Sequence, residues 1–199
     1  RAIPTAKNID AEMYIPEDIR LEHSGMQGYA KLTGNQLEDW KTELRGMHAD
    51  MVYEVARWSE EFKIHKQHLN RYLEPFRMQY KIMTANEEVW NYFIDLRAAS
   101  DADPAIQNLA KQIRSELCKS ESQTLDFGEW HLPYVDSTDA ADIMVSAARC
   151  ARTSYKAHDG KEPTREEDIK LAKWLVAHRH LTPFEHQATP YSPWGLSLI

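Results

Sequence analysis

The segment His180–His186, near the C-terminal end, concentrates side chains that could do chemistry. It holds two histidines, a threonine hydroxyl, a glutamate carboxylate and a phenylalanine ring, and it follows a stretch with helical periodicity. The segment could bind a metal, bind the edge of an organic cofactor, or use its polar groups to satisfy its own backbone. Zinc needs three or four ligands at defined spacing, and Pro183 breaks the helix that would align His178, His180 and His186. The spacing therefore disfavours a metal and leaves the other two interpretations open.

A second polar group surrounds the boundary between two expected helices. Asp95 and Arg97 lie near the end of the first helix, and Asp101 and Gln107 flank the start of the next. An arginine beside a helix N-terminus suits a phosphate or an anionic ring. The alternative is an ordinary helix–loop–helix corner with Asp103 as its cap, and periodicity alone favours this corner.

A third candidate is the tract Ala148–Tyr155, in which Arg149 and Arg152 lie next to hydroxyl side chains. These arginines could bind phosphate, or they could form a solvated helix end that the helix dipole favours. The chain has no glycine-rich phosphate loop, no nucleophile elbow and no Rossmann fingerprint. Nucleotide binding by those routes is therefore disfavoured.

Composition limits the possible classes of protein. The chain has 199 residues, 28% of them charged, and a formal net charge of −7, which argues against a general nucleic-acid or anionic-membrane binder. There is neither a signal segment nor an apolar run of the roughly 20 residues that a membrane span needs. Two cysteines outside any C-x-x-C motif predict reduced thiols and a cytoplasmic location. We expect a single domain over residues 1–199 that lacks an N-terminal segment.

The expected elements are mostly helical. Apolar residues three or four apart predict a long helix from Asn35 to Phe62, with Asn35 as its cap, and a shorter helix over 64–73. Further helices are expected to start at Asn86 and at Asp103-Pro104 and to cover about 139–151 and 164–178, the last with a Thr164–Glu167 capping box.

Strand signals are fewer. The alternation of Phe76, Met78, Tyr80 and Ile82 with polar or basic residues predicts a strand, and a weaker strand signal lies within 121–136. We expect a helix-rich α+β (α/β) fold with a small central mixed sheet flanked by helices. A single chain need not complete this sheet by itself.

Together these blocks resemble the flavin-dependent thymidylate synthases, in the form common in phages. Ala148–Tyr155 followed by His180–His186 is similar to that family's A-R-x-S-Y and H-x-S-P-F-E-H patterns, and His65–Phe76 resembles its H-K-Q-x-x-N-R-x-L-E-P-F block. Trp90–Gln107 is similar to the F-x-x-L-R … A-Q-x-E-I-R block, and Arg1–Pro4 resembles the end of S-S-R-A-I-P. The histidine block comes last here, whereas it comes first in the commoner branch, which is the order of a circular permutation.

The resemblance implies a specific reaction, the reductive methylation of dUMP to dTMP. Methylenetetrahydrofolate supplies the carbon, and FAD reduced by NADPH supplies the hydride. It also implies a homotetramer with shared active sites, in the cytoplasm of a bacterium or of a phage-infected host. Charge, composition and ligand spacing predict no nucleic acid, membrane or metal. By position, FAD would contact His180, Thr182, Glu185, Asp95, Arg97 and Asp101. Arg1 and Gln107 would bind dUMP, and Gln107 would take the catalytic position at uracil N3.

The chain departs from the family pattern at defined positions. Only the last arginine of the R-H-R-x-x-S-x-N-E-x-S-x-R signature is matched, by Arg1, and Gln107 replaces an arginine that promotes ionisation of uracil N3. Tyr80 stands where the commoner branch has a dUMP-binding arginine, although Arg77 and Lys81 are close in sequence. An amide cannot stabilise an N3 anion as a guanidinium does, but it can both donate and accept a hydrogen bond. Two alternatives therefore remain, an enzyme for another pyrimidine nucleotide such as dCMP and a catalytically silent homologue with an assembly or binding role.

Overall fold

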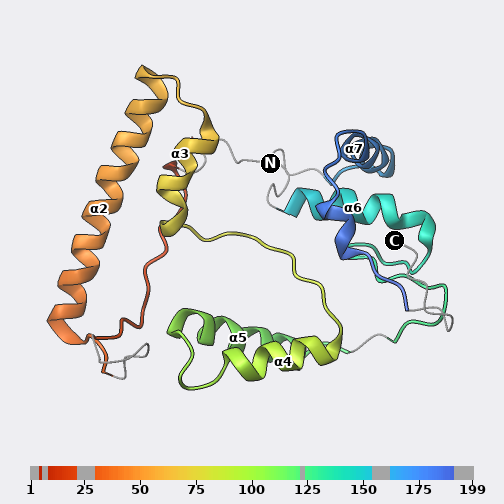
Figure 1. The fold of residues 1–199 in the computed structure, drawn as a ribbon, viewed down its shortest axis with the longest axis horizontal. Helices are drawn as coiled ribbons and strands as arrows, with labels where there is room; N and C mark the ends of the chain where they lie inside the picture. Colours follow the sequence, from red (N-terminus) through yellow and green to blue (C-terminus); the bar gives the residue numbers. More distant parts are fainter. Residues whose placement is uncertain (1–4, 6–8, 22–29, 122–123, 154–161, 191–199) are drawn as a thin grey trace. The chain divides into compact units, whose positions relative to one another are not determined.

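The computed structural model describes residues 5, 9–21, 30–121, 124–153 and 162–190 (Figure 1). The chain divides into two compact units. Unit 1 contains Arg1–Gln79 and Ala85–Glu121, and unit 2 contains Tyr80–Thr84 and Ser122–Ile199. Each unit is described by itself. The expected single domain stays a prediction, because compactness of two units does not decide whether they fold separately.

Unit 1 begins with a long helix packed on a short one. Helix α2 (Gly34–Glu61) and α3 (Lys66–Leu73) are followed by the 3-10 turn η1 (Glu74–Phe76). Val55, Leu69 and Leu73 are at most 1% exposed and form the core between α2 and α3. The predicted helices are confirmed, with one difference at the start of α2. Its N-cap is Thr33 rather than Asn35, and no side chain caps it.

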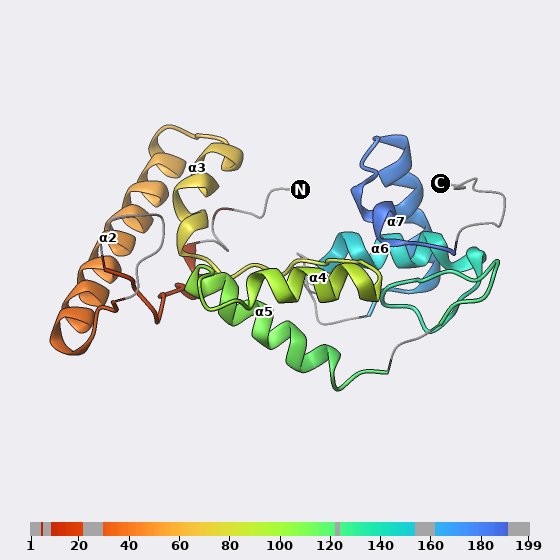
Figure 2. The ribbon, with the colours of Figure 1, turned by 60° about the horizontal axis from the view of Figure 1, so that its bottom comes forward.

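The second helix pair of unit 1 is the α4–α5 hairpin (Figure 2). Helix α4 (Glu87–Arg97) starts where Asn86 accepts a hydrogen bond from the Val89 N–H at 2.9 Å. Helix α5 (Pro104–Leu117) starts where Asp103 accepts from the N–H groups of the two residues that follow Pro104. Both predicted caps are confirmed, because each side chain satisfies N–H groups that have no partner within the helix.

Unit 2 is built around α6 and α7. The turn η2 (Ala140–Asp142) leads into α6 (Ile143–Arg152), and α7 (Arg165–Ala177) is followed by the 3-10 turn η4 (Thr182–His186). Small buried residues of α6 let α7 and η4 pack closely against it. The predicted Thr164–Glu167 capping box is confirmed.

The predicted sheet is wrong for the part of the chain that the structure describes, which is helix-rich and has no β-strand. Residues 77–86 are extended, yet their only bridge joins Arg77 to Met13. The segment 124–136 likewise contributes one bridge, between His131 and Ala188. Alternating polarity favours an extended backbone, but a strand also needs a neighbouring ladder of hydrogen bonds, and no second described segment supplies one.

Among the described helices, none has both the length and the apolar character needed to cross a membrane.

Candidate functional site: the 180–186 loop

The end of α7 fixes the start of the 180–186 loop, which comprises His180–His186. The Arg179 N–H donates to the Val176 carbonyl at 3.0 Å, and the His180 N–H donates to the Leu175 carbonyl at 2.9 Å. Together with the left-handed φ of 56° at Arg179, these two bonds form a Schellman motif. The backbone entering the loop is therefore fixed by the helix itself.

Arg179 is an unusual residue for this position. Glycine normally occupies the left-handed site of a Schellman motif, because a side chain there costs roughly 1–2 kcal/mol. Arg179 was not among the predicted site residues. The signal that could have found it is the absence of glycine after the predicted end of this helix.

Trp174 supports the histidine that opens the loop. The ring centroids of Trp174 and His180 are 5.6 Å apart with an interplanar angle of 28°, and His178 stacks on the same indole at 4.1 Å and 22°. The His178 ring is fixed further by a 2.8 Å contact between its Nδ1 and the Trp174 carbonyl. The stacking of His180 on Trp174 is the kind of contact that commonly accompanies a Schellman motif, between the second residue after the C-cap and the last turn of the helix. The imidazole of His180 is thereby oriented without using a ring nitrogen.

The far end of the loop is attached to α6 by Gln187, which is 9% exposed. Its Nε2 donates to Ser146 Oγ at 3.1 Å and to Cys150 Sγ at 3.6 Å. The Ser146 hydroxyl in turn donates to the Pro133 carbonyl at 2.8 Å. Just before Gln187, the half-buried His186 contacts Thr84 Oγ1 through Nδ1 at 3.3 Å. The loop is thus fixed at both ends by groups outside its predicted cofactor contacts.

The predicted cofactor contacts themselves lie exposed on the loop. The side chains of His180, Thr182 and Glu185 make no hydrogen bond or ion pair with any residue that the structure describes. Their polar groups therefore do not serve to satisfy the loop's own backbone, which was one of the two open interpretations. The described residues also contain no cluster of three or more histidine, cysteine or acidic side chains that could bind a metal.

The other predicted contacts lie on the α4–α5 hairpin, where several are engaged. Asp95 pairs with Arg114 at 3.1 Å. The amide of Gln107 donates from Nε2 to the Ala99 carbonyl, and its Oε1 accepts from Lys111 Nζ at 2.9 Å. Asp103 serves as the α5 cap, so the corner has the structural role that periodicity favoured.

Arg97 and Asp101 differ from these engaged hairpin residues. Both are exposed. Asp101 already interacts with another group of the protein. Arg97, in contrast, forms no ion pair or side-chain hydrogen bond within the described chain. Arg97 is thus the hairpin residue best placed to contact a ligand.

The arginines of the third candidate join α6 to α7. Asp168 is fully buried and pairs with Arg149 at 3.2 Å and with Arg152. Arg149 also donates to the Tyr134 carbonyl at 2.7 Å. Burial lowers the pKa of Arg152 from its ordinary value. These two guanidinium groups therefore serve first as partners of a buried carboxylate.

The structure groups the predicted site residues in two sets. His180, Thr182 and Glu185 lie together in unit 2, whereas Asp95, Arg97, Asp101 and Gln107 lie together in unit 1. Arg1 lies outside the described residues. The residues that fix the loop, among them Trp174, Arg179, Ser146 and Gln187, were not among the predicted ones.

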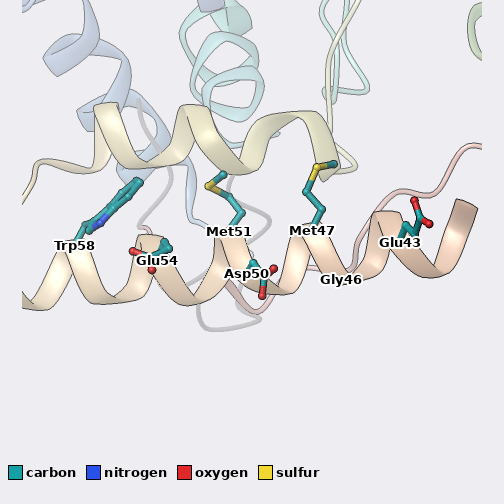
Figure 3. A pocket seen from close by; sticks show the side chains of 7 residues that line it. All are labelled: Glu43, Gly46, Met47, Asp50, Met51, Glu54 and Trp58. Carbon is teal, nitrogen blue, oxygen red and sulfur yellow. The ribbon is translucent and has the colours of Figure 1, made fainter.

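A hollow of about 480 Å³ lies along α2 and contains none of the predicted residues. Figure 3 shows Met47, Met51 and Trp58 pointing to the same side of the helix. The other residues that line the hollow are Glu43, Gly46, Asp50 and Glu54. With three carboxylates and no lysine or arginine, this hollow does not suit a phosphate-bearing ligand.

The 180–186 loop offers hydrogen-bonding groups of both kinds to a ligand. The Glu185 carboxylate is an acceptor, and the Thr182 hydroxyl and the His180 imidazole can donate. Comparison of the chain with protein-family models, with curated proteins and with solved structures found no match.

Proposed function

We propose that this chain is a flavin-dependent thymidylate synthase of the permuted, phage-like branch. It methylates dUMP to dTMP with methylenetetrahydrofolate and NADPH as co-substrates and FAD as cofactor. The proposal includes a homotetramer with shared active sites and a cytoplasmic location. Its sequence support is the arrangement of the four blocks that resemble this family.

One structural observation carries the proposal. The 180–186 loop is fixed at both ends by Leu175 and Gln187, while His180, Thr182 and Glu185 have no polar partner among the described residues. Polar groups that are ordered but unpartnered are pre-organised for a ligand, because binding then costs little additional ordering. This arrangement supports a cofactor edge better than a self-satisfied loop.

The predicted residues of each unit have defined parts in the proposed activity. Glu185 accepts a hydrogen bond from the ring N–H of the flavin, and Thr182 and His180 donate to its carbonyl oxygens. Arg97 offers a guanidinium for an anionic group, and Gln107 donates to and accepts from the pyrimidine. When bound, reduced FAD supplies the hydride that completes methylation at C5.

Gln107 would have to exchange partners to take this part. Its amide is engaged by Ala99 and Lys111. Both partners are replaceable by a pyrimidine edge, since a primary amide has two donors and an acceptor. Binding would then break two hydrogen bonds and form two others.

The test is flavin content followed by turnover. Purified protein should be yellow, or should take up FAD on reconstitution, and should release the C5 hydrogen of labelled dUMP when folate and NADPH are present. A colourless protein that FAD cannot reconstitute would contradict the proposal. Turnover of labelled dCMP alone would identify the enzyme as one for another pyrimidine nucleotide, and flavin binding without turnover of either substrate would favour the silent homologue.

A further inference from the structure

The residue after the C-cap of α7 has a feature that the proposed flavin contacts do not explain. Arg179 occupies a left-handed position, φ 56°, that glycine fills without strain. Its side chain is exposed and forms no hydrogen bond or ion pair within the described chain. The strain is therefore not offset by any contact of the guanidinium.

The helix dipole is the competing explanation, because a cation near a helix C-terminus is favourable. Lys63, just after α2, also has a left-handed φ of 51°. A cation in this conformation therefore needs no ligand to account for it. Arg179, however, has neighbouring side chains that could bind a ligand together with its guanidinium.

Arg179 lies between two imidazoles whose positions are fixed. His178 and His180 both stack on Trp174, and both are exposed. The 180–186 loop begins at the second of them and contributes the carboxylate of Glu185. One end of this surface thus offers an acceptor, and the other offers an unpartnered guanidinium beside the His180 imidazole, whose ring nitrogens have no partner among the described residues, whereas the Nδ1 of His178 is engaged by the Trp174 carbonyl.

We propose that Arg179 binds an anionic group, a phosphate or a carboxylate, of a ligand that the 180–186 loop contacts. A guanidinium forms paired, charge-assisted hydrogen bonds with either group. The identity of the ligand rests on the proposed function. It could be the phosphate of dUMP, a phosphate of FAD or NADPH, or a glutamate carboxylate of the folate.

The decisive variant is Arg179→Gly, because strain and binding then predict opposite changes. Removing the left-handed side chain should raise the thermal midpoint by a few degrees. Removing the guanidinium should weaken the affinity for the ligand about tenfold, which is 1.4 kcal/mol. Arg179→Lys should keep the interaction with the helix dipole but recover only part of the affinity. Lys173→Gln, an exposed change on the same helix, is the control for lost charge.

Calorimetric titrations with separate ligands distinguish the sources of the anion. FAD, dUMP, NADPH and methylenetetrahydrofolate are each titrated into the four proteins. NADH beside NADPH tests the 2′-phosphate, and deoxyuridine beside dUMP tests the 5′-phosphate. The expected result is one ligand whose affinity falls in Arg179→Gly but holds in Lys173→Gln. Affinities within twofold of wild type for every ligand would overturn the proposal.

An arm with inorganic phosphate separates this inference from the proposed function. Phosphate is titrated while the arginine Nε–H signals are followed by nitrogen–proton NMR. Arg57, which forms ion pairs with Glu54 and Glu61 on α2, is the reference signal. A saturable shift of the Arg179 signal, with that of Arg57 unchanged, supports the anion site even if the protein binds neither FAD nor dUMP. An Arg179 signal that neither phosphate nor any of the four ligands moves would overturn the inference while leaving a flavin-binding protein intact.

Discussion

The α4–α5 hairpin and the 180–186 loop both carry polar residues predicted to contact FAD or dUMP, but they use them differently. On the hairpin, Asp95 pairs with Arg114, and Gln107 bonds to Ala99 and Lys111. On the loop, the corresponding side chains have no polar partner among the described residues, and the surrounding framework does the fixing.

The type of a polar residue and its availability to bind a ligand are therefore separate properties. A polar side chain that stabilises its own element must give up that contact before it binds a ligand. A side chain fixed through its backbone and its ring has no such contact to lose. The loop should therefore dominate ligand affinity, whereas the hairpin should contribute more to its own stability.

The ion pairs that join α6 to α7 should matter most for stability. Asp168 is fully buried and pairs with two arginines, so Asp168→Ala should lower the free energy of unfolding by about 3 kcal/mol. The hairpin's ion pair is the matched control. Asp95 and Arg114 are 80% and 50% exposed, so Asp95→Ala should cost less than about 1 kcal/mol. Urea denaturation measures both, and equal losses would break the comparison.

A smaller effect separates binding from stability. Glu185→Gln should weaken FAD affinity roughly tenfold, since a hydrogen bond to a charged group contributes about 1.5–3 kcal/mol. The same change should leave the thermal midpoint unaltered, because Glu185 is exposed and unpartnered within the described residues. Gln107→Leu should do the reverse, lowering stability by about 1 kcal/mol while FAD affinity holds. If the two variants behave alike in flavin titration and thermal melting, the distinction between loop and hairpin fails.

Gln107→Arg tests what position 107 of the hairpin contributes to turnover. Under the proposed function, an arginine at this position should hold or raise turnover of dUMP, because it can stabilise the N3 anion of uracil. The cost in stability should be a few tenths of a kcal/mol, since Lys111 would then face a like charge one turn away. Tritium release from labelled dUMP measures the rate. A fall of more than about tenfold, or 1.4 kcal/mol, would mean that Gln107 has a role of its own.

The sequence predicted the helices and most of their caps because those signals are local. Asn86, Asp103 and Thr164 each satisfy N–H groups within three residues, so their spacing alone identifies them. The prediction of a sheet was wrong because the alternation over 76–82 indicates an extended backbone but carries no information about a partner strand. Gln187 was missed for a related reason, since its contacts with Ser146 and Cys150 are 41 and 37 residues away.

The reactivity of the two cysteines compares the C-terminal end of the α4–α5 hairpin with the far end of the 180–186 loop. Cys118 follows the hairpin and is exposed, whereas Cys150 is buried beside Gln187. Burial raises the pKa of the Cys150 thiol above its ordinary value, so less thiolate is present at any given pH. A folded-state pKa that is raised above the unfolded one also means that stability falls slightly as alkaline pH passes the unfolded value. At pH 8, iodoacetamide should therefore modify Cys118 first, and Cys150 only as fast as the protein opens. Gln187→Ala removes a donor to the sulfur and detaches the loop from α6, so it should speed labelling of Cys150 and leave Cys118 unchanged. Peptide mass spectrometry over a time course measures both rates, and equal labelling of the two thiols in the wild type would show that the far end of the loop is not fixed as described.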